Sequence, residues 1–297
     1  MAISLLEYGA NTQQAAVKPV VEVFNASSVF MRRLRFIEVS DFSYTYDLES
    51  TLGTVGFRAL NQSYVSDEGL TIPKVETLRI MGGTIKTDRQ LAMGERGRRK
   101  RAGNIAKKVK KSGQFFDKMV IEGDSGVDPK QFDGLRVRCQ GSQNIAMGGT
   151  LTLAKLREAI DQTVGDTKII VCNKFIRRKI SDLVTLAGGT TVTDIQKQLT
   201  RYDNYDIEVL DEDAYEVPTL TFTEASSTCS AYVVGLGSET DEEFTQGLLR
   251  MPEGSEAITV RDDGERDGNV YDLVEAVVGI GTFHPRSVTR ISGISRT

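Results

Sequence analysis

The stretch from residue 96 to residue 122 constrains the fold of this chain more than any other segment. Its apolar residues recur at steps of three and four, the period of one face of an α-helix. They are Ala102, Ile105, Ala106, Val109, Phe116, Met119 and Val120. A continuous helix over this stretch would be roughly 40 Å long at 1.5 Å per residue. Gly103 and Gly113 each cost about 1 kcal/mol relative to alanine, so they are the positions at which such a helix would bend or break.

The same stretch concentrates positive charge. Nine basic residues and no carboxylate lie between positions 96 and 111: Arg96, Arg98, Arg99, Lys100, Arg101, Lys107, Lys108, Lys110 and Lys111. Without these nine, 28 of the 37 Lys and Arg remain against 41 Asp and Glu, a net charge of −13, although the whole chain carries only −4. Segregated charge of this kind indicates that one element faces a polyanion, and nucleic acid is the obvious candidate.

A solvated helix face is the alternative reading of the basic run. Contact with nucleic acid is favoured over it, because a solvated face would normally mix both signs of charge to limit self-repulsion. No aromatic residue interrupts the run, and no helix-turn-helix or zinc-finger spacing frames it. The pattern therefore predicts recognition of the phosphate backbone rather than of base sequence.

Two alternating patterns upstream of the helix predict the strands of an extended hairpin. Apolar residues alternate with small or polar ones from 53 to 60 and again from 77 to 81. The polar loop between them is long for a compact domain, which is typical of a functional loop. We expect Gly82 and Gly83 to form a bulge that shifts the phase of the second strand.

Two parts of the chain lack a cover for their apolar residues. A two-stranded ribbon is marginal in water, and no helix follows either strand to cover it locally. Residues 1–40 form an arm, since polar and small residues separate its short apolar clusters and leave too little apolar surface to fold alone. Other copies of the same chain in a closed assembly are the economical cover. The residues expected at the interface between copies are Val55, Phe57, Tyr64, Leu70, Ile72, Lys74, Leu78 and Ile80.

Residues 150–236 alternate between helical and strand patterns. Helices are expected at 153–164, 175–186 and near 195–202, with an apolar strand at 169–172 and later strands at 207–210, 219–222 and 231–234. Such a segment can bury its own sheet between helices, which predicts a separate α/β domain. The end of the chain adds strands at 257–260 and 270–280, which flank the polar turn RDDGERDGN.

Motifs of enzymatic chemistry are missing from the sequence. It has no phosphate-binding loop, dinucleotide fingerprint, nucleophile elbow or zincin helix. His284 is the only histidine, and Cys139, Cys172 and Cys229 show no paired spacing. We therefore expect no catalytic residue, no metal, no cofactor and no disulfide framework, and a reducing, cytosolic setting.

Three alternatives concern smaller features. The carboxylates of the turn at 262–267 fit a solvated hairpin tip better than a Ca²⁺ loop, whose spacing they do not match. An enzyme with its site at Asp166, Asn173 and Asp182 is a rival hypothesis that a loss of activity on changing these residues would support. The N-terminus MAISLLEYGA lacks the pattern of a signal peptide, and VEAVVGIGTF is too short for a membrane span, so we expect neither secretion nor membrane insertion.

The order of these parts resembles that of the major capsid proteins of tailed bacteriophages, the Hong Kong 97 fold. Residues 30–69 are similar to the junction between the family's N-terminal arm and extended loop, and VETLRIMGGTIKTDRQLA to the strand that leads back. Residues 97–124 resemble the long spine helix, and FDGLRVRC resembles a phrase that follows it. DTKIIVCNKFIRRKISDLV is similar to the strand and helix of the axial domain, and VEAVVGIGTFHPRSVTRISGI to the closing strands.

The resemblance implies an α+β capsid fold with named parts. These are an N-terminal arm (1–40), an extended β-hairpin loop (41–88), a peripheral domain with the spine helix (89–149), an α/β axial domain (150–240), a return to the peripheral domain (241–280) and a C-terminal strand (281–297). It implies a structural, non-enzymatic protein that assembles itself into an icosahedral head around double-stranded DNA. In the family the spine helix lies near the inner surface, so the basic run would meet the packaged DNA.

The resemblance also implies partners. Besides hexamers and pentamers of the chain itself, they are a separate scaffolding protein, a portal and a decoration protein, in a virion assembled in the host cytoplasm. The separate scaffolding protein is expected because no helical scaffolding segment precedes the arm. Some members crosslink a lysine of the extended loop to an asparagine, and Lys74 and Asn269 lie in the corresponding regions. An encapsulin-like compartment and a DNA-coating protein that does not recognise sequence are the alternative functions.

Overall fold

The computed structural model describes residues 27–51, 53–64, 69–165, 167–187, 200–210, 219–237, 244–251 and 258–296. Most strands join one eleven-stranded sheet, whose main path runs through β11 (Thr259–Arg266), β12 (Asn269–Thr282), β10 (Thr245–Arg250), β9 (Cys229–Leu236), β6 (Thr167–Cys172), β8 (Tyr205–Val209) and β7 (Arg201–Tyr202). Off this path, β1 (Phe36–Val39) pairs with β10, β4 (Arg79–Asp88) with β12, β13 (Val288–Ile294) with β9, and β5 (Asn144–Gly149) with β13. The mixed α+β class predicted from the sequence is confirmed.

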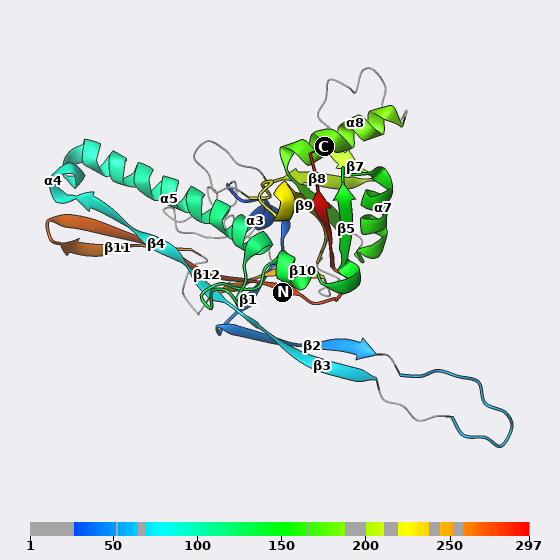
Figure 1. Ribbon diagram of the computed structural model, residues 1–297. Helices are drawn as coiled ribbons and strands as arrows, with labels where there is room; N and C mark the ends of the chain where they lie inside the picture. Colours follow the sequence, from blue (N-terminus) through cyan, green and yellow to red (C-terminus); the bar gives the residue numbers. More distant parts are fainter. Residues whose placement is uncertain are drawn as a thin grey trace.

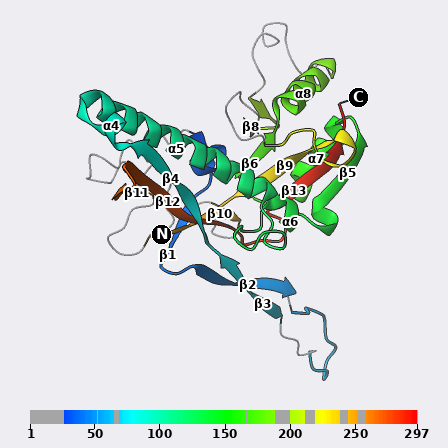
Figure 2. The same ribbon diagram turned by 60° about the vertical axis from the view of Figure 1, so that its left-hand side comes forward.

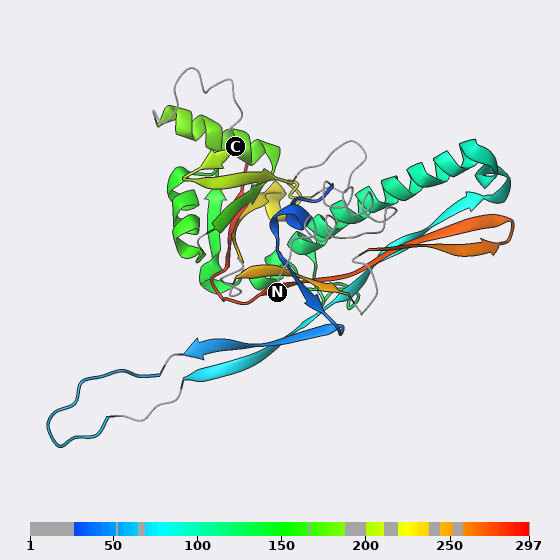
Figure 3. The ribbon, with the colours of Figure 1, turned by 180° about the vertical axis from the view of Figure 1, so that it is seen from behind.

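Two projections extend from a central body (Figure 1). One consists of α4 (Arg89–Ala92) and α5 (Gly94–Glu122) beside β4, β11 and the first half of β12. The other is a separate two-stranded ribbon of β2 (Ser43–Thr51) and β3 (Leu70–Thr77). Short elements complete the chain: α3 (Val29–Arg33), α6 (Leu135–Arg138) and the 3₁₀ turns η1 (Gly141–Gln143) and η2 (Ala225–Ser227). The view from behind shows that the two projections leave the body in different directions (Figure 3).

The body holds the predicted α/β segment. Helices α7 (Leu153–Gln162) and α8 (Lys174–Leu186) accompany β6, β8 and β9, close to the predicted positions. All eight residues of β9 are buried, as expected of a central strand covered on both faces. Asn173 begins α8, because its side-chain oxygen accepts a hydrogen bond from the backbone N–H of Ile176 at 2.8 Å.

Two further elements predicted in this segment, a strand at 219–222 and a helix near 195–202, are not found as predicted among the described residues. The strand expected at 219–222 is wrong, since Leu220 has a positive φ of 53°, which no strand residue adopts. The Leu220 carbonyl accepts instead from the side chain of Asn173 at 3.0 Å. Most of the helix expected near 195–202 lies outside the described residues, and its last two residues form β7.

The predicted long helix is confirmed as α5, one helix of 29 residues. It lies along β4 and β12, as the view turned by 60° also shows (Figure 2). Neither Gly103 nor Gly113 interrupts it, and Gly113 is buried within its packed face. Val109, Phe116, Met119 and Val120 of the predicted apolar stripe are buried on the packed face of the helix and Ile105 is half-buried. Ala102 and Ala106, which the prediction also placed on that face, are exposed.

The predicted bulge at Gly82 and Gly83 is wrong. β4 pairs with β12 in unbroken antiparallel register from Arg79 opposite Val278 to Asp88 opposite Asn269. A Cβ at Gly82 would lie 2.2 Å from the carbonyl oxygen of Val274 on β12. The glycine is therefore explained by the close approach of two backbones.

The ribbon exists as predicted, but its strands lie elsewhere. Residues 53–60 form no strand, and β2 and β3 pair over 43–51 and 70–77. The sequence signal for β2 is the alternation of Tyr44 and Tyr46 with polar residues, which the sequence analysis did not use. Pro73 was predicted to lie in the loop but lies within β3. Proline has no backbone N–H to donate, and it is tolerated here because both strands of a two-stranded ribbon are edge strands.

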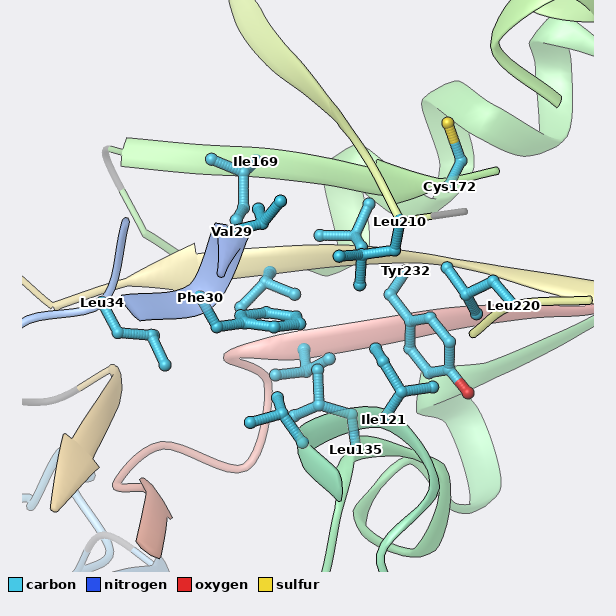
Figure 4. Close-up of a cluster of buried hydrophobic side chains, with 14 of the residues drawn as sticks. Val29, Phe30, Leu34, Ile121, Leu135, Ile169, Cys172, Leu210, Leu220 and Tyr232 are labelled. Carbon is cyan, nitrogen blue, oxygen red and sulfur yellow. The ribbon is translucent and has the colours of Figure 1, made fainter. Parts of the chain in front are cut away.

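The expectation of an arm over residues 1–40 is wrong for its last part. Phe30, Met31, Leu34 and Phe36 are all buried in the chain's own core, and β1 pairs with β10. Figure 4 shows Phe30 facing the cluster formed by α5, α6 and the strands of the body. Residues 1–26 lie outside the described residues.

The polar turn near the C-terminus contains fewer residues than predicted. β11 runs on through Arg266, and the chain reverses at Asp267 and Gly268, whose φ values of 51° and 69° suit a tight hairpin. The strand predicted at 257–260 begins at Thr259 and continues through most of the residues assigned to the turn. The strand predicted at 270–280 is confirmed within β12.

Candidate nucleic-acid and subunit interfaces

A tight corner positions the start of α5. Gly94 has φ 75°, a left-handed conformation that glycine adopts without strain. One turn later, a Cβ at Gly97 would lie 2.5 Å from the backbone carbonyl oxygen of Leu91 on α4. These two glycines let α4 fold against α5, so that α5 returns along the strand from which the chain has just come (Figure 2).

Arg101 fastens the first half of α5 to the sheet. Its Nε and Nη2 donate to the two carboxylate oxygens of Asp272 on β12, at 2.8 and 2.6 Å, and Nη2 also donates to Asp262 on β11 at 2.6 Å. Only 4% of the Asp272 side chain is exposed, against 26% for Arg101. The hydrogen bond from Arg101 also lowers the pKa of Asp262. Arg101 is thus occupied by its own chain rather than directed at an external polyanion.

Lys108 is also held against the sheet. A Cβ at Gly83 of β4 would lie 2.7 Å from the Lys108 Nζ, so the lysine side chain lies across that strand. Lys108 is half-buried, as is Arg101. Two of the nine residues predicted to face nucleic acid therefore pack on the sheet side of the helix.

The other seven predicted cations are exposed: Arg96, Arg98, Arg99, Lys100, Lys107, Lys110 and Lys111. At 100° per residue, Arg96, Lys100, Lys107 and Lys111 fall on one side of α5, and we call these four the outward stripe. It spans roughly 22 Å at 1.5 Å per residue. Arg99 donates to Glu95 one turn earlier at 2.5 Å, but both side chains are exposed, so the pair contributes little to stability.

Seven of the eight predicted interface residues are exposed within this single chain. Val55 and Phe57 lie on the tip of the ribbon and are fully exposed, and Tyr64, Leu70, Ile72, Lys74 and Ile80 are exposed as well. The prediction is wrong for Leu78, which is 2% exposed and packs with Val39 and Leu248 of its own chain. Leu78 faces inward because it lies at the junction of β3 and β4, where the ribbon joins the body.

The root of the ribbon is fixed by an ion pair and stacked rings. Arg138 of α6 donates to both carboxylate oxygens of Glu76 on β3, at 2.6 and 2.7 Å. The Tyr46 hydroxyl donates a hydrogen bond to the same carboxylate at 3.2 Å. The rings of Tyr46 and Phe283 pack edge to face, with their centroids 4.7 Å apart. Burial and the Glu76 charge raise the pKa of Tyr46. The direction in which the ribbon leaves the body is therefore set by specific contacts (Figure 1).

The two residues suggested for a crosslink lie on different projections. Lys74 is on β3 of the ribbon, and Asn269 begins β12 at the far end of the other projection (Figure 1). The two lie far apart within one chain, so a bond between them would have to join two copies. The crosslink remains a prediction.

The remaining candidates for chemistry are distributed over the molecule. Asn173 is a buried helix cap, Asp182 is an exposed residue of α8, and Asp166 lies outside the described residues. The three cysteines are buried and none is in a disulfide, and burial raises the pKa of Cys139 to about 12. Among the described residues, no group of His, Cys, Asp or Glu is arranged to hold a metal ion, and no helix is long and apolar enough to cross a membrane.

Two carboxylates that were not predicted as structural residues, Asp117 and Asp272, are buried. Asp272 lies on the same face of β12 as Val270 and Val274, and Asp117 lies among buried apolar residues of α5. Asp117 accepts hydrogen bonds from the Ser28 hydroxyl at 2.5 Å and from the backbone N–H groups of Val29 and Phe30 at 2.9 and 3.1 Å. A charged residue at an apolar register was the available signal for both.

Comparisons with known proteins show the fold. No family model matches the chain, and no curated protein matches it. Solved structures do: the holo encapsulin complex of Synechococcus elongatus has a TM-score of 0.66 at 11% identity, covering 90% of this chain and 87% of that one. The capsid of a native GTA particle has a TM-score of 0.65 at 11% identity, covering 91% of both chains. A structure of Mycobacterium phage Bobi has a TM-score of 0.63 at 10% identity, covering 89% of this chain and 90% of that one. The resemblance to phage capsid proteins drawn from the sequence is confirmed at the level of the fold.

Proposed function

We propose that this chain is the structural subunit of an icosahedral shell that encloses double-stranded DNA in the head of a tailed bacteriophage. The observation that carries the proposal is the exposed outward stripe of α5, in a chain of which 91% is covered by the match to the capsid of a GTA particle. The rest of the chain is acidic, so a polyanion would be attracted to this one element. The protein works by packing, and turnover of a substrate has no part in the proposal.

The outward stripe would bind phosphates in any base sequence. Arg96, Lys100, Lys107 and Lys111 lie in a row without aromatic or apolar residues that could read bases. Each phosphate that is neutralised releases counterions, so log affinity for duplex DNA falls with log salt by roughly 0.9 per phosphate. Arg101 and Lys108 hold the helix on the sheet and so present the stripe, without contacting DNA themselves.

The ribbon would make the contacts between copies. Its apolar residues Val55 and Phe57 are fully exposed within the described part of the chain, and Leu70 and Ile72 are exposed over about half of their surface. A neighbouring copy would cover them, which also explains how a long two-stranded ribbon persists. In this proposal residues 1–26 are the arm, β2 and β3 the extended loop, α5 the spine helix and the α/β body the axial domain.

Further partners follow from the same proposal. A separate scaffolding protein would direct the curvature of the growing shell, a portal would occupy one vertex, and a decoration protein would bind the outer face. Assembly would take place in the host cytoplasm and the product would be a virion.

An encapsulin-like compartment is the second candidate, favoured by the TM-score of 0.66 to an encapsulin complex. The nine basic residues argue for nucleic acid, because a protein cargo gives no reason for so cationic an element. A free DNA-coating protein is the third candidate. It predicts strong salt-dependent DNA binding by the monomer and no closed particle without DNA.

Negative-stain electron microscopy of the expressed protein, with analysis of the particle contents, tests the proposal. We expect closed particles of megadalton size and nuclease-resistant DNA inside particles filled in the host. K100Q/K107Q should assemble normally but retain less DNA, whereas the matched control K86Q/K130Q, which neutralises two exposed lysines elsewhere, should retain the wild-type amount. A stable monomer under all assembly conditions would contradict the shell, and equal DNA in both double variants would contradict the role of the stripe.

A further inference from the structure

The root of the ribbon contains a cavity of about 340 Å³. Ribbon and body both line it. Leu48 and Lys74 come from β2 and β3, and the opposite wall is built from residues 138–143 and 282–288. Its side chains include Lys74, Arg138, His284 and Arg286, and none of the residues that line it carries a carboxylate.

One of these cations is already neutralised. The guanidinium of Arg138 donates to both oxygens of Glu76, to the Thr282 hydroxyl and to the backbone carbonyls of Ile280 and Asp133. Its donors are therefore occupied, and Arg138 serves as a fixed wall of the cavity. Lys74 and Arg286 are different, because within the described residues neither is in an ion pair with a carboxylate.

His284 adds an imidazole N–H donor to the two cations. Its Nδ1 accepts the backbone N–H of Arg286 at 3.0 Å, so the neutral imidazole carries its hydrogen on Nε2. Among the described residues, the Arg286 side chain donates only through its Nε, to the carbonyl of Gln162 at 3.1 Å, so the terminal nitrogens of its guanidinium remain as donors there. The cavity thus combines an ammonium, a guanidinium and an imidazole N–H without an acceptor of matching charge.

We propose that this cavity is a binding site for an oxyanion, either a carboxylate or a phosphate-like group. Charge-assisted hydrogen bonds from Lys74 and Arg286 would supply most of the affinity, and His284 would orient the group. Lys74 belongs to the ribbon and Arg286 to the body, so a bound anion would bridge the two beside the Glu76–Arg138 pair. The site needs no shell and stands whether or not the proposed function is correct.

His284 makes the test specific, because it is the only histidine in the chain. Diethyl pyrocarbonate modifies histidine in a reaction that ultraviolet absorbance follows selectively, so the rate reports this one cavity. We expect sulfate to slow the modification of the full-length protein relative to chloride at equal ionic strength. At a sulfate concentration about ten times its dissociation constant the slowing should be roughly tenfold.

Variants decide whether the cavity itself is responsible. K74Q should lose most of the protection by sulfate, while K86Q, which removes an exposed lysine of β4, should keep it. Acetate distinguishes the two sources of the group: protection by acetate as well as sulfate identifies a carboxylate ligand, and protection by sulfate alone a phosphate-like one. Equal rates in sulfate, acetate and chloride, or full protection in K74Q, would overturn the proposal.

Discussion

The guanidinium of Arg101 on α5 and the carboxylate of Asp272 on β12 form a two-point ion pair, with donor–acceptor distances of 2.8 and 2.6 Å. One partner is nearly buried and the other a quarter exposed. The pair joins a helix that carries strong positive charge to a hairpin rich in carboxylates. It therefore decides which side of α5 faces outward.

Removing Arg101 should destabilise the subunit strongly. In R101M the Asp272 carboxylate would stay buried without its partner, which costs about 3 kcal/mol of unfolding free energy. R99M removes a cation whose partner Glu95 is exposed, and should cost less than about 1 kcal/mol. Urea unfolding of the unassembled subunit measures both, and equal losses would show that the Arg101 pair has no structural role.

Two glycines of the same helix should respond to alanine in opposite ways. At Gly103 a Cβ meets nothing within 4 Å, so G103A should stabilise the subunit by about 1 kcal/mol through helix propensity. At Gly97 a Cβ would lie 2.5 Å from backbone atoms of α4, so G97A should destabilise it. Thermal unfolding of the two variants gives the signs, and a stabilising G97A would refute the tight corner.

Asp117 should make stability depend on pH in an unusual direction. Burial raises its pKa from 3.8 to about 6, so between these values the folded state binds the proton more tightly than the unfolded state. The stability that Asp117 contributes is therefore fully present below about pH 4 and is lost as the pH rises through 6. The loss in unfolding free energy is about 3 kcal/mol, since one pKa unit corresponds to 1.36 kcal/mol. Asp262 and Asp133, whose pKa values are lowered, act in the opposite sense, so wild type must be compared with D117N.

The difference in unfolding free energy between wild type and D117N isolates the contribution of Asp117. The stability of wild type relative to D117N, measured by urea unfolding, should be greater at pH 4 than at pH 7. A difference that is independent of pH would show that Asp117 has an ordinary pKa in the folded protein.

Alanine substitutions of Leu78 and Ile72, both predicted at the subunit interface, should have different effects on stability and on assembly. Leu78 is buried in its own chain, so L78A should lower the unfolding free energy of the monomer by about 2–5 kcal/mol. Ile72 is exposed on β3, so I72A should leave monomer unfolding nearly unchanged and weaken assembly. Unfolding and light-scattering assays on both variants test this, and impaired unfolding of I72A would contradict it.

Periodicity in the sequence was sufficient where an element is long and one-sided. The apolar steps between Ala102 and Val120 located α5, and the run of four apolar residues at 169–172 located β6. It failed where tertiary contacts override local pattern: Leu220 adopts a positive φ, and Gly82 reflects a neighbouring backbone. The burial of Val29, Phe30, Met31, Leu34 and Phe36 could not be foreseen, because their cover includes α5 and β10, which are distant in the chain.

The candidate interfaces were predictable in composition but not in direction. All nine cations lie on α5, yet sequence alone could not show that Arg101 and Lys108 turn toward the sheet. That division depends on Asp262, Asp272 and Gly83, which lie on strands paired with each other. The oxyanion cavity combines residues 74 and 284–286, more than two hundred positions apart, and no local pattern links them.

The 14 residues of β12 have a mechanical consequence. The first half of this strand is held between β4 and β11 in the projection, and the second half is paired with β10 in the body. A force applied to the distal hairpin would therefore be transmitted to the body along the continuous backbone of β12, and the hydrogen bonds to its neighbouring strands would bear part of that force. The subunit would therefore resist bending along β12, from the distal hairpin to the body.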